Sequence, residues 1–253
     1  IVSLLLASCT VAPVASVEEE GISTYILGVA QPLTGSLGEY GTDFAKGIDL
    51  AVEQMNAQLS AAGAGVQFTT ATADTETTPE GAARAVQNLV QTSGTQVIVG
   101  PLTTGEVLGA KQFADENEVV LVAPASSAPS ATVPDDYVFR LFYPPDTYAA
   151  RAFAQIAVAR SYENVVILAM DDPFGNGLVE AFTSNFTGGG ELAVTKYAPE
   201  PTDVTSEVTR VSADIARLSG EGSTAFLCIC FLADAQKVIQ LSLTDPNMGT
   251  VDW

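Results

Sequence analysis

Residues 95–130 read TQVIVGPLTTGEVLGAKQFADENEVVLVAPASSAPS, and this stretch decides the fold. Two short apolar runs, at 97–99 and 119–122, flank a segment with helical character from about 103 to 116. Unbroken runs of β-branched residues on either side of a helix are typical of a βαβ unit in a parallel sheet that is covered on both faces. The sequence therefore predicts an α/β fold built on parallel sheets.

Hydroxyl-bearing side chains follow both of these predicted strands. Thr103 and Thr104 come after the first strand, and Ser126 and Ser127 come after the second. Because such crossovers are right-handed, both strand ends lie at one edge of the sheet, where ligands of open parallel sheets bind. A threonine at the start of a helix also lies beside free backbone N–H groups that favour an anion. We expect a small polar binding site here, although helix capping and turn formation alone would also explain these residues.

The composition narrows the classes of function. The chain has 253 residues, of which 47% are hydrophobic, enough for one large domain or two smaller ones. The chain has ten Lys and Arg and 30 Asp and Glu, which gives a net charge of −20. This negative charge argues against nucleic acid or anionic lipid headgroups as partners. The absence of histidine removes the Ser-His-Asp and Cys-His systems and the commonest metal ligand. We therefore expect no enzyme activity, no metal and no cofactor.

The N-terminal residues predict export and a lipid anchor. Residues 1–6 are apolar but too few to span a bilayer, and they resemble the tail of a signal peptide. Leu6-Ala7-Ser8-Cys9 resembles the bacterial lipobox, which predicts lipid attachment at Cys9 and a flexible tether that ends near residue 23. A cloning remnant or a buried cysteine is the alternative. The expected location is the cell envelope, on the periplasmic or extracellular face of the cytoplasmic membrane, with membrane contact only through the anchor.

A glycine-rich loop at 31–41 separates a first strand at 25–30 from a helix at 43–56. Its glycines miss the GxGxxG spacing and no Gly-Lys-Ser/Thr follows, so a turn that shapes a ligand cleft is favoured over phosphate binding. The further predicted elements are a strand at 66–73, a helix at 79–91, strands at 137–143, 165–170, 191–197 and 224–231, and helices at 147–161, 177–186, 204–218 and 232–243.

Two cysteines lie on the last of these strands. Cys228 and Cys230 are two residues apart and would share one face of an extended strand, too stretched to form a comfortable bridge. We expect buried free thiols. The lack of histidine and of any CxxC pair disfavours a metal site.

The order of motifs resembles the type I periplasmic binding proteins. The motifs are PLTGSLGEYG before a helix, TETTPEGA before the next, VIVGPLTT, and VVLVAPASSAP. Within that group the likeness is strongest to the branched-chain (leucine/isoleucine/valine) amino-acid receptors of ABC transporters, and it covers residues 25–253. It implies two Rossmann-like lobes joined by a hinge, with residues 1–23 as leader and tether, 24–143 as lobe one and 144–253 as lobe two. Because family members continue further, lobe two is expected to be incomplete.

The resemblance also implies the site residues. Thr104 and Ser127 match the hydroxyls that hold an amino-acid ligand, Ala125 matches a backbone contact, and Ser126 lies between the last two. Phe174 matches an aromatic residue that covers the ligand, where relatives often have tyrosine.

A second contact from lobe two is expected near Phe231 or Leu232. The acid that clasps the ligand's ammonium group in relatives is expected beyond Trp253. That gap leaves amide, urea and aromatic-acid ligands open beside amino acids.

Three functions are compatible with these features. The first is an extracytoplasmic receptor that hands an amino acid or similar small polar solute to an ABC permease in the membrane. The second is a sensory or regulatory module of the same fold. The third, which nothing in the residue spacing supports, is an amidase that uses Thr34 or Thr104 with Asp74 or Asp171.

Overall fold

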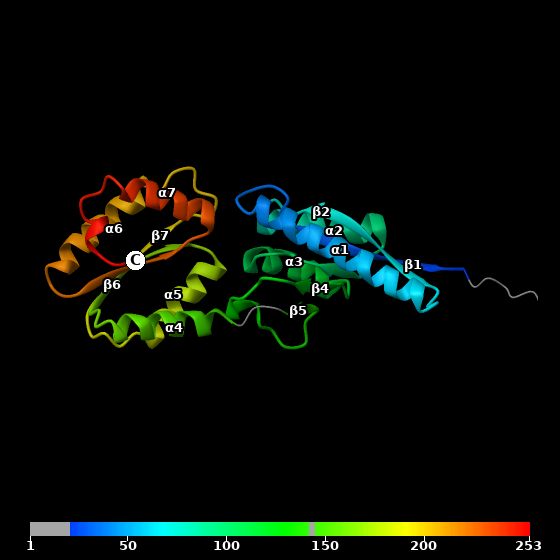
Figure 1. Cartoon of the computed structure of the whole chain (residues 1–253), viewed down its shortest axis with the longest axis horizontal. Helices are drawn as coiled ribbons and strands as arrows, with labels where there is room; N and C mark the ends of the chain where they lie inside the picture. Colours follow the sequence, from blue (N-terminus) through cyan, green and yellow to red (C-terminus); the bar gives the residue numbers. More distant parts are fainter. Residues whose placement is uncertain (1–20, 142–144) are drawn as a thin grey trace, which may run out of the picture.

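Two parallel sheets organise the protein, as the sequence predicted. The computed structural model describes residues 21–141 and 145–253. One sheet has five strands in the order β2-β1-β3-β4-β5, and the other has three in the order β7-β6-β8. Figure 1 shows them in separate halves along the longest axis of the molecule, and we call these halves lobe one and lobe two.

Strands and helices alternate along both lobes. Lobe one contains β1 (Ser23–Gln31), α1 (Gly38–Ala61), β2 (Val66–Asp74), α2 (Pro79–Ser93), β3 (Val97–Val99), α3 (Thr104–Glu116), β4 (Val120–Ala123), a short 3₁₀ helix (Pro129–Ala131) and β5 (Val138–Arg140). Lobe two contains α4 (Asp146–Ala159), β6 (Asn164–Met170), α5 (Pro173–Asn185), β7 (Leu192–Tyr197), α6 (Thr205–Ser219), β8 (Thr224–Ile229), α7 (Leu232–Ser242) and a second 3₁₀ helix (Met248–Thr250). The pattern of βαβ units thus accounts for every long element.

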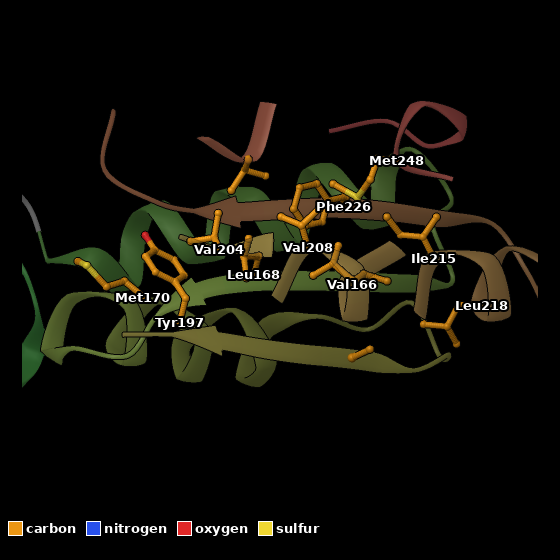
Figure 2. Close-up of a cluster of buried hydrophobic side chains, with 13 residues drawn as sticks. Val166, Leu168, Met170, Tyr197, Val204, Val208, Ile215, Leu218, Phe226 and Met248 are labelled. Atoms are coloured by element: carbon orange, nitrogen blue, oxygen red, sulfur yellow. The ribbon is translucent and has the colours of Figure 1, made fainter. Parts of the chain in front are cut away.

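Alternate residues of β6 point to opposite faces of the second sheet. Val166 and Leu168 pack with Ile215 of α6 and Phe226 of β8 on one face, as Figure 2 shows. Val165 and its alternate neighbours pack against α4 and α5 on the other face. All seven positions of β6 are buried, because a central parallel strand covered on both sides has no solvent face.

In lobe one, β3 and β4 run in parallel, with Val99 opposite Val122. Ile98 and Leu121 are fully buried in one core cluster, where they pack with side chains of α2 and α3. This register brings the two strands to an end at the same edge of the sheet. The segments that the sequence marked with hydroxyls therefore leave the sheet side by side.

Two helices begin earlier than the sequence predicted. Helix α1 starts at Gly38 rather than 43, and α5 starts at Pro173 rather than 177. The Asp172 side chain accepts a hydrogen bond of 2.7 Å from the Gly175 N–H, and Pro173 occupies the first helical position, where its missing N–H is not needed. Phe174 therefore lies in the first turn of a helix and not in a loop.

Gly41 explains the early start of α1. It is buried in the first turns of the helix, and a Cβ atom there would lie 1.9 Å from the Pro32 carbonyl oxygen. The glycine allows the helix to approach the end of β1 closely, which a residue with a side chain would prevent. Glycine-rich sequence here reflects close packing and not a long loop.

The prediction of two free thiols was wrong, because Cys228 and Cys230 form a disulfide. Strand β8 ends at Ile229 and not at 231, so Cys230 lies just beyond the strand. Their Cα atoms lie 5.6 Å apart, within the range that a disulfide needs.

Replacing Gly41 with alanine is expected to lower the free energy of unfolding by about 1–3 kcal/mol, because the new methyl group meets the Pro32 carbonyl. Gly47 is the matched control in the same helix, since a Cβ atom there meets nothing within 4 Å. Gly47→Ala should gain about 0.5–1 kcal/mol from helix propensity. Urea unfolding of the complete protein measures both, and equal effects of the two changes would contradict this packing.

The tryptic peptide that spans residues 218–237 contains both Cys228 and Cys230. Without reduction, its mass is expected to be two hydrogen atoms below that of the dithiol, and it should resist alkylation. Reduction before alkylation should add two alkyl groups. Alkylation of both cysteines in the unreduced, unfolded protein would refute the disulfide.

Candidate functional site

A cleft of about 440 Å³ lies between the lobes, at the carboxyl ends of the central strands. Its volume is in the range of small-molecule sites, roughly 300–1,000 Å³. The residues that line it come from both lobes: Leu37, Tyr40, Phe44, Leu102, Thr103, Thr104, Ala125, Ser127, Asp146, Phe174, Cys230, Phe231 and Leu232. Four of the five predicted ligand-binding residues are therefore brought together in one cavity.

The Thr104 hydroxyl joins the two strand ends of lobe one. Its oxygen accepts hydrogen bonds from the Ser126 hydroxyl at 3.1 Å and from the Ala128 N–H at 3.3 Å. A hydroxyl group has two lone pairs and one proton, so both acceptor positions of Thr104 are filled. The Thr104 hydroxyl proton is therefore free to donate a hydrogen bond, and a ligand oxygen in the cleft can accept it.

Ser126 has a different place from the one predicted. It is buried and is not among the cleft-lining residues, and its hydroxyl bonds Thr104 instead. Ala125 and Ser127, on either side of it, do line the cleft.

The start of α3 is held by Glu106, a residue that was not predicted from the sequence. Thr103 and Glu106 form a capping box, in which the Glu106 carboxylate accepts from the Thr103 N–H at 2.8 Å. The carboxylate also accepts from the Thr75 hydroxyl at the end of β2. Burial raises the pKa of Glu106, although these hydrogen bonds act in the opposite direction. The T-x-x-E spacing was the signal that could have identified this support.

Two stacked aromatic rings form the lobe-two wall. Phe174 of α5 and Phe231, just before α7, have ring centroids 5.5 Å apart and an interplanar angle of 14°. Leu232 continues this apolar wall. The sequence predicted Phe174 here, with a second contact near Phe231 or Leu232, and all three line the cleft.

A third wall comes from the end of the glycine-rich segment 31–41, which the sequence predicted to shape a ligand cleft, and from the start of α1. Leu37, Tyr40 and Phe44 line the cleft from lobe one. Because the helix was predicted to begin at residue 43, Tyr40 was expected in a loop. The Ser36 N–H donates to the Glu200 carboxylate at 3.1 Å, which is a direct contact between the lobes beside this wall.

Asp146 is the one acidic residue that lines the cleft among the residues the structure describes. It begins α4, where the chain passes into lobe two, and its backbone N–H donates to the Ser127 carbonyl at 3.1 Å. Its side chain is buried, and one carboxylate oxygen has no hydrogen-bond partner within the described chain. Burial raises its pKa, while the Ser127 hydroxyl and Arg140 act to lower it.

One threonine–acid pair of the amidase alternative, Thr34 with Asp74, is brought together, but outside the cleft. Thr34 donates to Asp74 at 2.6 Å, but neither lines the cleft. Burial opposes the shift, yet hydrogen bonds from Thr34 and nearby backbone N–H groups hold the pKa of Asp74 below its usual value, which makes it a weak base. Asp171 bonds Asn176 and Lys196 in a different cavity.

Other expected features can be placed only in part. Within residues 21–141 and 145–253, no three His, Cys, Asp or Glu side chains gather as a metal site would require. No helix in the same part of the chain is long and apolar enough to cross a membrane. Cys9 and the predicted lipobox lie outside the described residues, as does the predicted lobe boundary between residues 143 and 144.

Known proteins resemble this chain in sequence and in fold. The Leu/Ile/Val-binding protein BraC3 of Rhizobium johnstonii is 28% identical over 213 residues, which are 83% of this chain and 56% of that protein. The substrate-binding protein LivJ of Streptococcus pneumoniae, solved with isoleucine, is 25% identical with a TM-score of 0.70, over 87% of this chain and 61% of that one.

A solute-binding protein of an ABC transporter from Rhodopseudomonas palustris, solved with 3,4-dihydroxybenzoic acid, shares the fold. It is 20% identical with a TM-score of 0.69, over 87% of this chain and 58% of that one. This chain thus spans a little over half of the length of these relatives. The sequence profile described as "Periplasmic binding protein" matches residues 24–228, so the chain belongs to the periplasmic binding protein family.

Proposed function

We propose that this protein is the extracytoplasmic solute receptor of an ABC importer and binds an amino acid with an apolar side chain. The observation that carries the proposal is one cleft in which the Thr104 and Ser127 hydroxyls face the stacked rings of Phe174 and Phe231. Hydroxyl groups and the N–H groups at the start of α3 suit a carboxylate. The aromatic wall suits an aliphatic side chain.

The relatives support this ligand class. BraC3 is named for leucine, isoleucine and valine, and LivJ was solved with isoleucine. In this chain, Leu37, Leu102 and Leu232 add apolar surface to the same cleft. Burying an aliphatic side chain there gains about 25 cal/mol per Å² of apolar surface. The polar edge and the apolar walls together match an amino acid of this kind.

Transport, and not catalysis, is the role that we propose. The family and these relatives are binding proteins, and the Thr34–Asp74 pair of the amidase alternative lies outside the cleft. We also propose that an ABC permease in the membrane is the partner of this receptor. A lipid attached to Cys9 would anchor the receptor to that membrane.

Deletion of the gene is expected to abolish uptake of radiolabelled branched-chain amino acid at low concentration, because an importer without its receptor no longer captures dilute solute. Uptake by the deletion strain and by a strain that carries the restored gene measures this. Normal uptake together with a lost behavioural or transcriptional response would favour the sensory alternative.

Thr104→Ala and Ser127→Ala, each in the complete protein, are expected to weaken binding of L-leucine by about 1–3 kcal/mol, since each strands a polar group of the buried ligand. Titration calorimetry measures the affinity, after a thermal-shift screen with L-leucine, L-isoleucine and L-valine. Thr92→Ala on the surface of α2 is the matched control, because its hydroxyl bonds only the Asn88 carbonyl of its own helix and the neighbouring Ser93. Unchanged affinity in both cleft variants would contradict this site.

A further inference from the structure

The Cys228–Cys230 disulfide borders the ligand cleft. Cys230 lines the cleft, and the next residue along the chain is Phe231, which contributes one of the two stacked rings. Cys228 is not among the described residues that line the cleft, and it lies within β8, opposite Leu168 of β6. One residue of the bridge thus faces the cavity, and the other is part of the sheet.

Stabilisation of the whole fold does not account for this bond. In the chain-entropy model, a disulfide stabilises a protein more as the loop that it closes grows longer. Here the two cysteines have a sequence separation of two, so the bond removes little freedom from the unfolded chain. Its effect is local, and it falls on the few residues where β8 ends and α7 begins.

Those residues hold the Phe231 ring in the cleft wall. Phe231 is the N-cap residue of α7, and within the described chain no side chain caps this helix start. Its carbonyl accepts from the Asp234 N–H at 3.1 Å and from the Ala235 N–H at 2.8 Å, which holds the residue from its C-terminal side. On its N-terminal side, the disulfide restrains the chain directly before the ring. The intact bond therefore limits the positions that Phe231 can take against Phe174.

The cleft also gives a small molecule an approach to Cys230. Both cysteines are partly buried against the core of lobe two, but only Cys230 of the two lines the cavity. A thiolate breaks a disulfide by attacking one of its sulfurs, and access helps to decide which sulfur is attacked. A ligand that contacts Phe231 would fill the space through which the thiolate must pass.

We propose that this disulfide is a redox-active site, opened by a small thiol that attacks Cys230 Sγ from the cleft and shielded by a bound ligand. In the first step the thiol sulfur bonds to Cys230 Sγ, the bond between the cysteines breaks, and Cys228 leaves as a thiolate that takes up a proton. A second small thiol attacks the sulfur of the first. This step releases Cys230 as a thiol and joins the two small thiols as a disulfide, so that they supply both electrons.

This inference goes beyond the proposed function and rests on it for the ligand. Because reduction frees the chain directly before Phe231, the reduced protein is expected to bind its ligand more weakly than the oxidised protein. The coupling is reciprocal, so a bound ligand favours the intact disulfide by the same factor.

The first test identifies the sulfur that reacts. The complete protein is treated briefly with 2-mercaptoethanol, quenched with excess N-ethylmaleimide, and digested, and the peptide of residues 218–237 is sequenced by mass spectrometry. The folded protein is expected to carry mercaptoethanol on Cys230 and maleimide on Cys228. Urea-unfolded protein is the control and should give both arrangements. Attack at Cys228, or equal attack at both sulfurs in the folded protein, would overturn the proposed site.

The second test adds L-leucine to the same reaction. At about 100 times its dissociation constant, L-leucine is expected to slow the reaction of the folded protein by about 10- to 100-fold, since only the unliganded fraction reacts. It should not slow the reaction of the urea-unfolded protein, which excludes an effect on the thiol itself.

The third test measures L-leucine affinity by titration calorimetry with and without a phosphine reductant. Reduction is expected to weaken binding by about 2- to 10-fold, the cost of ordering one more side chain. The double variant Cys228→Ser with Cys230→Ser should bind like the reduced protein and should not respond to the reductant. Thermal melts check that each form is folded, and the reduced wild type alone decides if the variant unfolds.

The outcomes distinguish this inference from the proposed function. If L-leucine binds but neither slows the reaction nor loses affinity on reduction, the ligand-shielded redox site is overturned and the receptor proposal stands. If L-leucine does not bind the oxidised protein, the proposed ligand and its shielding effect are overturned together. In that case, selective attack at Cys230 still supports the thiol-reactive site, and unselective attack overturns it.

Discussion

The hydrogen bonds that the Thr104 hydroxyl accepts from Ser126 and from the Ala128 N–H hold the binding edge of lobe one together. They are possible only because β3 and β4 are parallel neighbours in register, so that both chains leave the sheet at the same edge. The same bonds fill the acceptor positions of Thr104 and leave its proton for a ligand. The pairing of β3 with β4 thus places Thr104 at the start of α3, and the bonds that Thr104 accepts there determine where its hydroxyl proton can point.

The described cleft is lined by one acidic and no basic side chain, in a protein with a net charge of −20. Most of the acidic residues are at the surface, while the described cleft contains Asp146 and several neutral hydroxyl groups. A neutral hydrogen bond contributes only about 0.5–1.5 kcal/mol net, so no single donor would hold a carboxylate firmly. Affinity must come from several such bonds together with the apolar surface of Phe174, Phe231 and the leucines. Such a sum of small terms is compatible with the receptor role proposed above.

Much of this architecture could be predicted from sequence because its strands are short, apolar and separated by helices of regular spacing. The hydroxyl groups at 104 and 127 and the ring at 174 could also be placed, since parallel strands bring their ends to one edge. The first turn of α1 could not be predicted, because Gly41 packs closely against the Pro32 carbonyl and this contact is seen only in the folded chain. The disulfide was missed because the strand was predicted to run past Ile229, which would hold the two cysteines too far apart. The position of Asp146 in the cleft could not be predicted either, because the local sequence does not show that its side chain is buried.

The distribution of contacts gives binding a way to act on the arrangement of the lobes. Lobe one supplies the hydroxyls and lobe two supplies the stacked rings, so a solute in the cleft touches both. A ligand shifts a conformational equilibrium only through contacts that differ between the two states, and contacts with both walls exist only when the lobes are near each other. The Ser36–Glu200 hydrogen bond is one protein contact that the same arrangement permits.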